Sequence, residues 1–396
     1  MTPHLLELGF HATIFTTQHK YREEIADEWM VELVGKDFEK IEIRSLPQFW
    51  TRKIGIGDLG LRWIPFLFPK LLMTVLKQKP DFILYPVPPW YLLVIAPVIK
   101  FFTGVKYGID FIDPWVEGGK LPTNASTKRK ISQFIAKSLE GWVCKHASII
   151  YSVSEGINKS LIERHPKLQN KPFFAISYGI EQNDYLNPVN HIRNSNDPIQ
   201  LRYIGAISDD SFTVAETLIC ALKTASEKNN IKVAFIGTSY AGKGMAVGHL
   251  TSFIKKYHAE NIISEDPNRV SYKKAIELTY LSDIMMVFGG MQPYYAASKL
   301  MGLIASKKPF IAFLHRDSFP CLFLEQLNYP YLVKYSQAEN DLPQIHVNEL
   351  TSILFEILHN FSTFEGVKIK DEILMKKYTA KGMTLQFIEP INNILG

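Results

Sequence analysis

The chain has 396 residues, of which 46% are hydrophobic and 21% are charged, and its formal net charge is +5 at pH 7. This length exceeds one ordinary core and fits two domains, and the composition excludes a disordered chain. Residues 1–180 hold 23 Lys/Arg and 17 Asp/Glu, or +6, whereas the remainder holds 21 and 22, or −1. This modest excess argues against a nucleic-acid-binding protein and indicates that the N-terminal half faces something anionic.

The cysteines and apolar runs bear on the compartment. Cys144, Cys220 and Cys321 stand far apart without metal-ligand spacing, which favours a reducing compartment. Met1 leads into polar and acidic residues rather than a signal peptide. The longest clean apolar run, Tyr91–Ile99, is shorter than the roughly 20 residues of a spanning helix. We therefore expect a cytoplasmic protein that touches the inner face of the cell membrane at most peripherally.

The chain opens with a predicted short helix, for which Thr2 is the N-cap, Pro3 suits the first turn and Gly9 suits the end. A strand is predicted next, over Ala12–Thr17. A doubly wound domain normally opens with a strand and a glycine-rich turn before such a helix, and both are missing. Either Met1 is an internal start, which we prefer, or this domain lacks a central strand.

Strand-like and helix-like segments alternate through the first half. Amphipathic stretches such as Leu59–Lys77 and Lys130–Lys145 separate short β-branched and aromatic runs. This alternation predicts a parallel sheet with helices on both faces. The strands are predicted at Ala12–Thr17, Ile41–Arg44, Phe82–Tyr85, Tyr107–Phe111 and Ile149–Val153.

A stretch rich in Asn, Asp and Pro at 181–198 predicts a linker, after which the same alternation restarts. We therefore predict an α/β protein with two doubly wound, Rossmann-like domains that face each other across a cleft. The first spans 1–180 and the second 199–382, and a final helix at 383–396 returns to the first. The later strands are predicted at Leu201–Ala206, Val233–Gly237, Ile284–Phe288, Phe310–Leu314 and Tyr331–Val333.

The order and spacing of several motifs resemble those of the GT-B glycosyltransferases, most closely the family 4-like group that uses nucleotide-sugar donors. Each motif is weak by itself, but together they extend over nearly the whole chain. They are LELGFHATIFTT at 6–17, KPDFILYPVPPW at 79–90, YGIDFIDPW at 107–115, ASIIYSVSEG at 147–156, SYGIE at 177–181, LRYIGAI at 201–207 and SKLMGLIASKKPFIA at 298–312.

The resemblance implies a GT-B fold with an acceptor-binding first domain and a donor-binding second domain. It implies a hexosyltransferase that retains the anomeric configuration and requires neither a metal nor a cofactor. Its substrates would be a nucleotide-sugar donor and a glycan or lipid-linked acceptor in surface polysaccharide biosynthesis. It would bind no nucleic acid.

The leaving group of such a donor is a diphosphate, whose charge needs cations or helix N-termini when no metal is present. Ser298 and Lys299 open the apolar helix Leu300–Ser306 and offer a hydroxyl, an ammonium and free N–H groups. They are candidate phosphate-binding residues, and a solvated helix cap is the alternative.

Other candidates follow predicted strands of the second domain. Gly205 and Gly237 allow backbone to approach a ligand closely, and Thr238 extends the second of these turns, although simple strand-end turns explain them equally. In the resembled family, the segment that corresponds to Val270, Ser271 and Tyr272 contacts the nucleotide base, where Tyr272 could stack.

In the first domain, Asp110 and Asp113 lie at the end of the strand KYGIDF. A carboxylate there could orient an acceptor hydroxyl or take its proton, and these two aspartates are the candidate catalytic residues. The alternative is that one of them caps the following turn. Trp90 and Trp115 could line an acceptor groove, or could simply be core residues.

The chain also departs from the family pattern. Gly302 stands where the family often has a glutamate that binds the donor ribose, and Asp209 and Asp210 stand where a basic pair usually grips the phosphates. These departures keep two alternatives open. One is a non-catalytic nucleotide-sugar-binding protein, and the other is a nucleotide-sugar epimerase on the same fold.

One stretch suggests a membrane. LRWIPFLFPKLLMTVLK at 61–77 mixes aromatic, leucine and cationic residues as interfacial helices do, and TKRK at 127–130 adds charge. We expect peripheral contact with an anionic membrane surface. An ordinary amphipathic helix packed on the sheet is the alternative.

Overall fold

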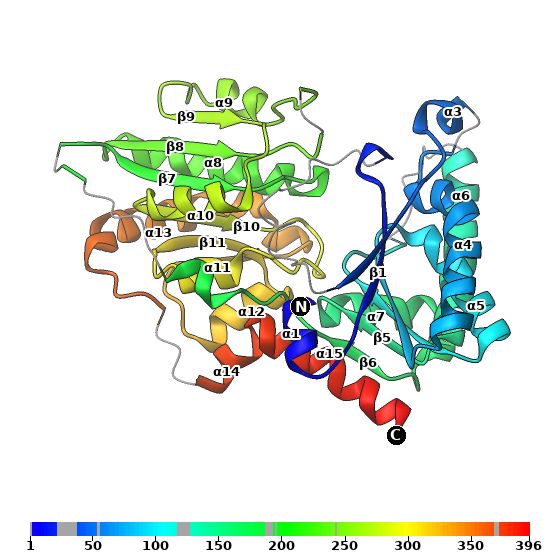
Figure 1. The fold of residues 1–396 in the computed structure, drawn as a ribbon. Helices are drawn as coiled ribbons and strands as arrows, with labels where there is room; N and C mark the ends of the chain where they lie inside the picture. Colours follow the sequence, from blue (N-terminus) through cyan, green and yellow to red (C-terminus); the bar gives the residue numbers. More distant parts are fainter. Residues whose placement is uncertain are drawn as a thin grey trace. The chain divides into compact units, whose positions relative to one another are not determined.

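The chain divides into two compact units in the computed structural model (Figure 1). Unit 1 contains residues 1–23, 34–177 and 382–396, and unit 2 consists mainly of residues 178–381. Part of the predicted linker, at 187–192 and 195, lies outside the described residues. The structure describes residues 2–21, 38–53, 56–116, 127–186, 193–194, 196–241, 244–367 and 372–396.

The strands of unit 1 are parallel and form two separate sheets. β1 (Thr13–Thr17) pairs only with β2 (Glu39–Ile43), and the larger sheet has the order β3-β4-β5-β6. Among the described residues, β1 and β2 are not hydrogen-bonded to any strand of the larger sheet. The strands of the larger sheet are Phe82–Val87, Lys106–Phe111, Ile149–Ser152 and Phe173–Ala175.

Helices that follow β2 to β5 cross between the strands of unit 1. The Asp58 carboxylate accepts a hydrogen bond from the Leu61 N–H at 2.9 Å and so starts α4, and Gly104 in the left-handed region ends α5. Of the described helices, α4 alone has the length and apolar composition of a membrane-spanning helix, but buried core helices share these properties, and its Leu67 and Leu71 are buried. These helices are α4 (Leu59–Gln78), α5 (Ala96–Thr103), α6 (Thr127–His146) and α7 (Glu155–Arg164).

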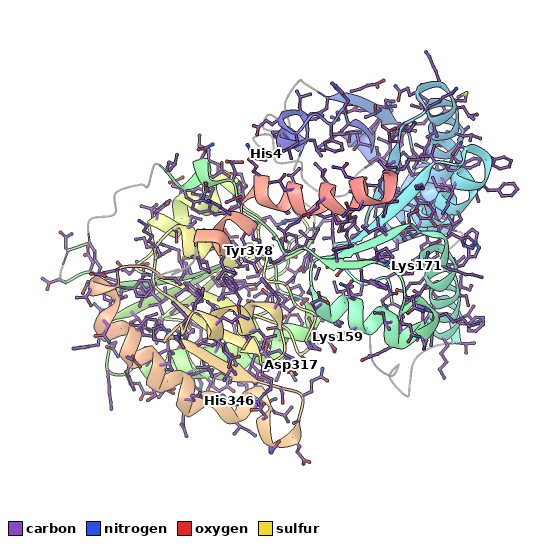
Figure 2. All side chains as sticks on the ribbon, turned by 90° about the horizontal axis from the view of Figure 1, so that it is seen from below. His4, Lys159, Lys171, Asp317, His346 and Tyr378 are labelled. Atoms are coloured by element: carbon purple, nitrogen blue, oxygen red, sulfur yellow. The ribbon has the colours of Figure 1, made fainter. Side chains whose placement is uncertain are left out.

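The C-terminal helix α15 (Ala380–Leu395) packs on the sheet of unit 1. The Tyr151 hydroxyl of β5 donates to the Phe387 carbonyl at 2.7 Å, and the two rings lie 4.6 Å apart. Figure 2 shows α15 on one side of these strands and α7, with its labelled Lys159, on the other. The remaining elements of unit 1 are α1 (Thr2–Glu7), η1 (His19–Tyr21), α3 (Gln48–Lys53), η2 (Trp90–Ile95) and η3 (Pro166–Leu168).

Unit 2 is built on one six-stranded parallel sheet with the order β12-β11-β10-β7-β8-β9. Every residue of β10 and β11 is buried, as expected for central strands covered on both faces. The direction of strand succession reverses between β7 and β10, which is where doubly wound sheets bind ligands. The strands are β7 (Ile199–Ile204), β8 (Ile231–Ile236), β9 (Ile263–Asp266), β10 (Ile284–Phe288), β11 (Phe310–His315) and β12 (Leu332–Tyr335).

Helices complete unit 2, and the largest helix-on-helix packing there joins α8 to α13. Apolar residues of α8 such as Val214, Leu218 and Leu222 are fully buried, which explains the amphipathic pattern of that segment. The helices are α8 (Phe212–Ser226), α9 (Thr251–Lys256), α10 (Tyr272–Tyr280), α11 (Leu300–Ala305), α12 (Phe319–Gln326), α13 (Val347–Asn360) and α14 (Glu372–Lys377), with short turns η4 (Gln182–Tyr185), η5 (Asp209–Ser211), η6 (Glu339–Asp341), η7 (Pro343–His346) and η8 (Phe361–Thr363).

Candidate functional site

The carboxyl ends of the parallel strands of unit 2 bring three loops together. Gly205 follows β7 with φ +139°, and Gly237 follows β8 with φ +75°, so both adopt backbone conformations that favour glycine. The Gly205 N–H donates to the Ile236 carbonyl at 2.8 Å. A Cβ on Gly237 would lie 3.6 Å from the Arg269 Cα and 3.9 Å from the Gly205 nitrogen. Two of the sequence-predicted glycines therefore lie side by side, with the Arg269 backbone against them.

Lys299 reaches the same loops from the start of α11. Its ammonium nitrogen lies 3.8 Å from the centre of the Tyr203 ring, and a Cβ on Gly205 would lie only 2.5 Å from that nitrogen. Burial lowers the pKa of Lys299 to about 7. A cation over an aromatic face and beside glycine backbone is available to an anionic ligand at this edge of the sheet.

Ser298 precedes this lysine and is exposed. The residue before it, Ala297, has φ 27°, a left-handed conformation that is rare for a residue with a Cβ. The helix that follows has only six residues, so the dipole that the sequence suggested is short. The positive charge of this stretch is therefore mainly that of the Lys299 ammonium and not that of the helix N-terminus.

Two further predicted residues use their side chains within the protein. The buried Thr238 hydroxyl donates to Glu265 at 2.7 Å, and the same carboxylate accepts the His249 and Leu250 N–H groups at 3.0 Å each. Ser271 is the N-cap of α10 and accepts the Lys274 N–H at 3.2 Å. For both residues, backbone groups remain as the possible ligand contacts.

Tyr272 contributes its hydroxyl to a cluster that the sequence did not reveal. It hydrogen-bonds to the Tyr185 hydroxyl and to Asp184, both of which belong to η4. The Tyr185 hydroxyl also stands where any Cβ on Gly302 would have to be. The glycine at position 302, where the resembled family often has a glutamate, therefore leaves the space that the Tyr185 hydroxyl occupies. Val270, the remaining predicted residue of this segment, is partly buried just before α10.

The acidic loop after β7 packs on the loop after β10. The Asp210 carboxylate fills the space beside Gly290 and accepts a short hydrogen bond from Ser208, and its carbonyl accepts the Met291 N–H at 3.2 Å. Asp209 is exposed beside it. These aspartates are loop-forming residues in place of the basic pair that grips phosphate in the resembled family.

In unit 1, the candidate catalytic residue Asp110 is next to last in β4. It is 9% exposed, and burial raises its pKa to about 7. No hydrogen bond to its carboxylate comes from the described residues. In the neighbouring strand, burial and secondarily the charge of Asp110 raise the pKa of Tyr151. A carboxyl group with such a pKa is suited to exchange a proton near neutral pH.

Asp113 lies two residues beyond β4, is exposed, and has a raised pKa because it is partly desolvated. The Trp90 indole N–H donates to its carbonyl at 3.2 Å, and the buried Trp115 packs edge-on against Tyr91 at 5.4 Å. Both predicted tryptophans therefore support the loop that carries Asp113.

A buried ionic cluster fixes the far end of this loop, and sequence reasoning missed it. Glu140 of α6 is fully buried and accepts two hydrogen bonds from Arg164, at 2.9 and 3.0 Å, and it lies 2.9 Å from His165. It also accepts the Val116 N–H at 3.3 Å. In the described part of the chain, no group of three His, Cys, Asp or Glu side chains could hold a metal ion.

The comparisons with known proteins concern the fold. No family model and no curated protein matches the chain. Among solved structures, it is similar to sucrose-phosphate synthase from Thermosynechococcus elongatus, with a TM-score of 0.67 and 11% identity over 99% of this chain and 91% of that one. It is also similar to HepE from Anabaena in complex with UDP-glucose, with a TM-score of 0.60 and 14% identity over 92% and 88% of the chains.

A third similar structure is the UDP-forming trehalose-phosphate synthase from Burkholderia xenovorans, with a TM-score of 0.56 and 9% identity over 82% of this chain and 77% of that one. These neighbours are GT-B glycosyltransferases, so the chain has the GT-B fold with two Rossmann-like domains. This confirms the predicted α/β class with two Rossmann-like domains.

Proposed function

We propose that the protein is a glycosyltransferase that moves a sugar from a nucleotide-sugar donor to a hydroxyl group of an acceptor. The observation that carries this proposal is the position of the Lys299 ammonium, over the Tyr203 ring and against Gly205, at the carboxyl edge of a GT-B donor unit. A cation held there suits a diphosphate, and HepE is known in complexes with UDP and with UDP-glucose.

In the proposed reaction, the bond between the anomeric carbon of the sugar and the β-phosphate oxygen breaks, and the acceptor oxygen takes its place. Lys299 stabilises the negative charge that develops on the leaving diphosphate. Asp110, whose pKa is about 7, accepts the proton of the acceptor hydroxyl; if it only orients that hydroxyl, the proton passes to the departing diphosphate. We further propose retention of the anomeric configuration, without a metal, on a glycan or lipid-linked acceptor of surface polysaccharide in the cytoplasm.

One observation favours a second candidate, a protein that binds a nucleotide-sugar without transferring the sugar. The Tyr185 hydroxyl fills the space at Gly302, and Asp209 and Asp210 stand in the loop where cations would hold the donor phosphates. Asp184 and the hydroxyl groups of Tyr185 and Tyr272 would then have to recognise the donor by hydrogen bonds of their own.

The test is release of nucleoside diphosphate from UDP-glucose, GDP-mannose and ADP-glucose, with and without membrane lipid extract as the source of acceptor. We expect release from one donor, stimulated by the extract. Asp110→Asn should lower it by about a hundredfold, whereas Asp81→Asn, which removes an exposed carboxylate of unit 1, should leave it unchanged. Binding of a donor without any release would favour the second candidate, and neither binding nor release would contradict both.

A further inference from the structure

Unit 1 exposes large apolar side chains on four consecutive helices. Phe49 and Trp50 of α3 are 67% and 65% exposed, Phe101 of α5 is 83% exposed, and Phe134 of α6 is 73% exposed. α4 contacts α5, and α5 contacts α6, so these three helices are neighbours in one layer. We use the name aromatic face for the exposed large apolar residues of α4 to α6 together with those of α3, which precedes α4 in the chain; it comprises Phe49, Trp50, Met73, Leu76, Phe101, Phe102, Ile131, Phe134, Ile135 and Trp142.

On α6 the exposed apolar residues follow a regular helical spacing. Its exposed apolar residues Ile131, Phe134, Ile135 and Trp142 recur at helical spacing, so they form one stripe along the helix. The buried side chains of the same helix, which include Val143, point to the opposite face. The helix is therefore apolar on two sides, one for the core of unit 1 and one that faces outward.

Charge on these helices has a single sign. α3, α4 and α5 contain no aspartate or glutamate, and the one carboxylate of α6, Glu140, is fully buried. The Lys53 ammonium lies 4.4 Å from the Phe49 ring and 5.0 Å from the Trp50 ring, so cation and aromatics are interleaved. The exposed cations on these helices are Arg52, Lys53, Lys70, Lys77, Lys130, Lys137 and Lys145, and one exposed cation and one exposed carboxylate, Lys79 and Asp81, follow α4.

We propose that the aromatic face and its cations bind the surface of an anionic lipid bilayer. Aromatic and aliphatic side chains would enter the boundary between headgroups and acyl chains, and the lysines would meet the lipid phosphates. The complementarity of charge favours this partner over a second copy of the chain, because two such faces would bring cations against cations. The inference rests on unit 1 alone and does not depend on the proposed transfer reaction.

Helix α7, the next helix along the chain, contrasts with α3 to α6. α7, which continues the same run of crossover helices, has the sequence EGINKSLIER and supplies no exposed large apolar residue. Exposure of aromatics is therefore a property of α3 to α6 and not of unit 1 helices in general. An interfacial surface confined to these elements would leave α7 in water.

The experiment is flotation of the full chain with vesicles of phosphatidylcholine alone and with 30% phosphatidylglycerol. We expect binding to the anionic vesicles that increases with their charge and falls as salt is raised from about 0.05 to 0.5 M. The double variant Phe101→Ser/Phe102→Ser should lower the partition coefficient by about tenfold or more, and Lys53→Glu/Lys137→Glu by a similar factor.

A matched control removes exposed apolar residues from unit 2. Met245→Ser/Val247→Ser changes two side chains that are as exposed as those of the aromatic face, and it should leave vesicle binding unchanged. Thermal melting of every variant checks the fold, which these exposed changes should preserve. Equal binding of wild type and both unit 1 variants would overturn the proposal. No binding to anionic vesicles would also overturn it, whether or not sedimentation velocity shows that the chain dimerises instead.

Discussion

The two units use the same parallel α/β construction. They differ in the continuity of their sheets, in the packing around those sheets and in the apolar side chains that they expose. In unit 2 the sheet is continuous, Tyr185 of η4 packs against Gly302 of α11, and Asp210 packs against Gly290 where the loops after β7 and β10 meet. In the described part of unit 1 the strands form two separate sheets, and aromatic side chains are exposed on the helices α3 to α6. The closely packed edge of unit 2 is the proposed site for a nucleotide-sugar, and the exposed apolar helices of unit 1 are the proposed site for a lipid surface.

The largest expected effect is in unit 1. Glu140→Ala leaves Arg164 and His165 without their buried partner and frees the Val116 N–H, so we expect a loss of about 3–5 kcal/mol in the free energy of unfolding. Chemical denaturation measures it. The control is Glu277→Ala, which breaks an exposed ion pair with Lys274 and should cost at most about 1 kcal/mol. Equal losses for the two variants would show that the buried cluster does not hold unit 1 together.

A smaller effect tests the tight packing of unit 2. Gly302→Ala places a methyl group against the Tyr185 hydroxyl and should cost about 1–3 kcal/mol of unfolding free energy. Tyr185→Phe in the same chain removes that oxygen and should restore part of the loss. Gly57→Ala is the control, because no atom lies within 4 Å of its added Cβ. If Gly302→Ala and Gly57→Ala melt alike, the space at Gly302 is not filled as described.

The third effect depends on pH. The pKa of Asp110 is raised to about 7 in the folded protein, so the fold favours the protonated carboxyl, and ionisation opposes folding as the pH rises from about 4 to 7. Asp110→Asn mimics the protonated form. We expect it to stabilise the protein by about 1–3 kcal/mol at pH 8 and to have little effect at pH 4. Denaturation at the two pH values measures this, and a stability change that is independent of pH would refute the assignment.

The smallest effect concerns ligand binding. Because burial lowers the pKa of Lys299 to about 7, its ammonium loses its proton as the pH rises through 7 in the free protein. The affinity for a nucleoside diphosphate should therefore fall by about three- to tenfold between pH 6 and pH 8.5, after subtraction of the pH dependence of Lys299→Ala. Identical pH dependences of wild type and variant would remove Lys299 as the titrating group.

The alternation of apolar and amphipathic segments predicted the doubly wound character and most strands. It missed β6, Phe173–Ala175, and β9, Ile263–Asp266, because both are short edge strands with exposed residues and lack a clear apolar run. These two edge strands can be recognised only from their pairing with the neighbouring strands. Sequence periodicity is strongest where a strand is covered on both faces, as in β10 and β11.

The candidate site was less predictable than the fold. The glycines predicted after strands do lie at the carboxyl edge of the sheet, but the sequence could not show that the Thr238 hydroxyl donates to Glu265. Nor could it show that Lys299 reaches Tyr203, or that Tyr185, over a hundred positions before Gly302, fills the space beside it. Such contacts depend on how distant segments pack, which local patterns do not encode.

The central claim is that the carboxyl edge of unit 2 binds a nucleoside diphosphate through Lys299. Titration calorimetry of wild type and Lys299→Ala against UDP, GDP and ADP at pH 6.5 tests it, with a thermal melt of both proteins. A charge-assisted hydrogen bond contributes about 1.5–3 kcal/mol, so the variant should bind about ten- to a hundredfold more weakly while keeping its fold. Equal affinity of wild type and variant for the same nucleotide, or no binding of any of the three by wild type, would contradict the claim.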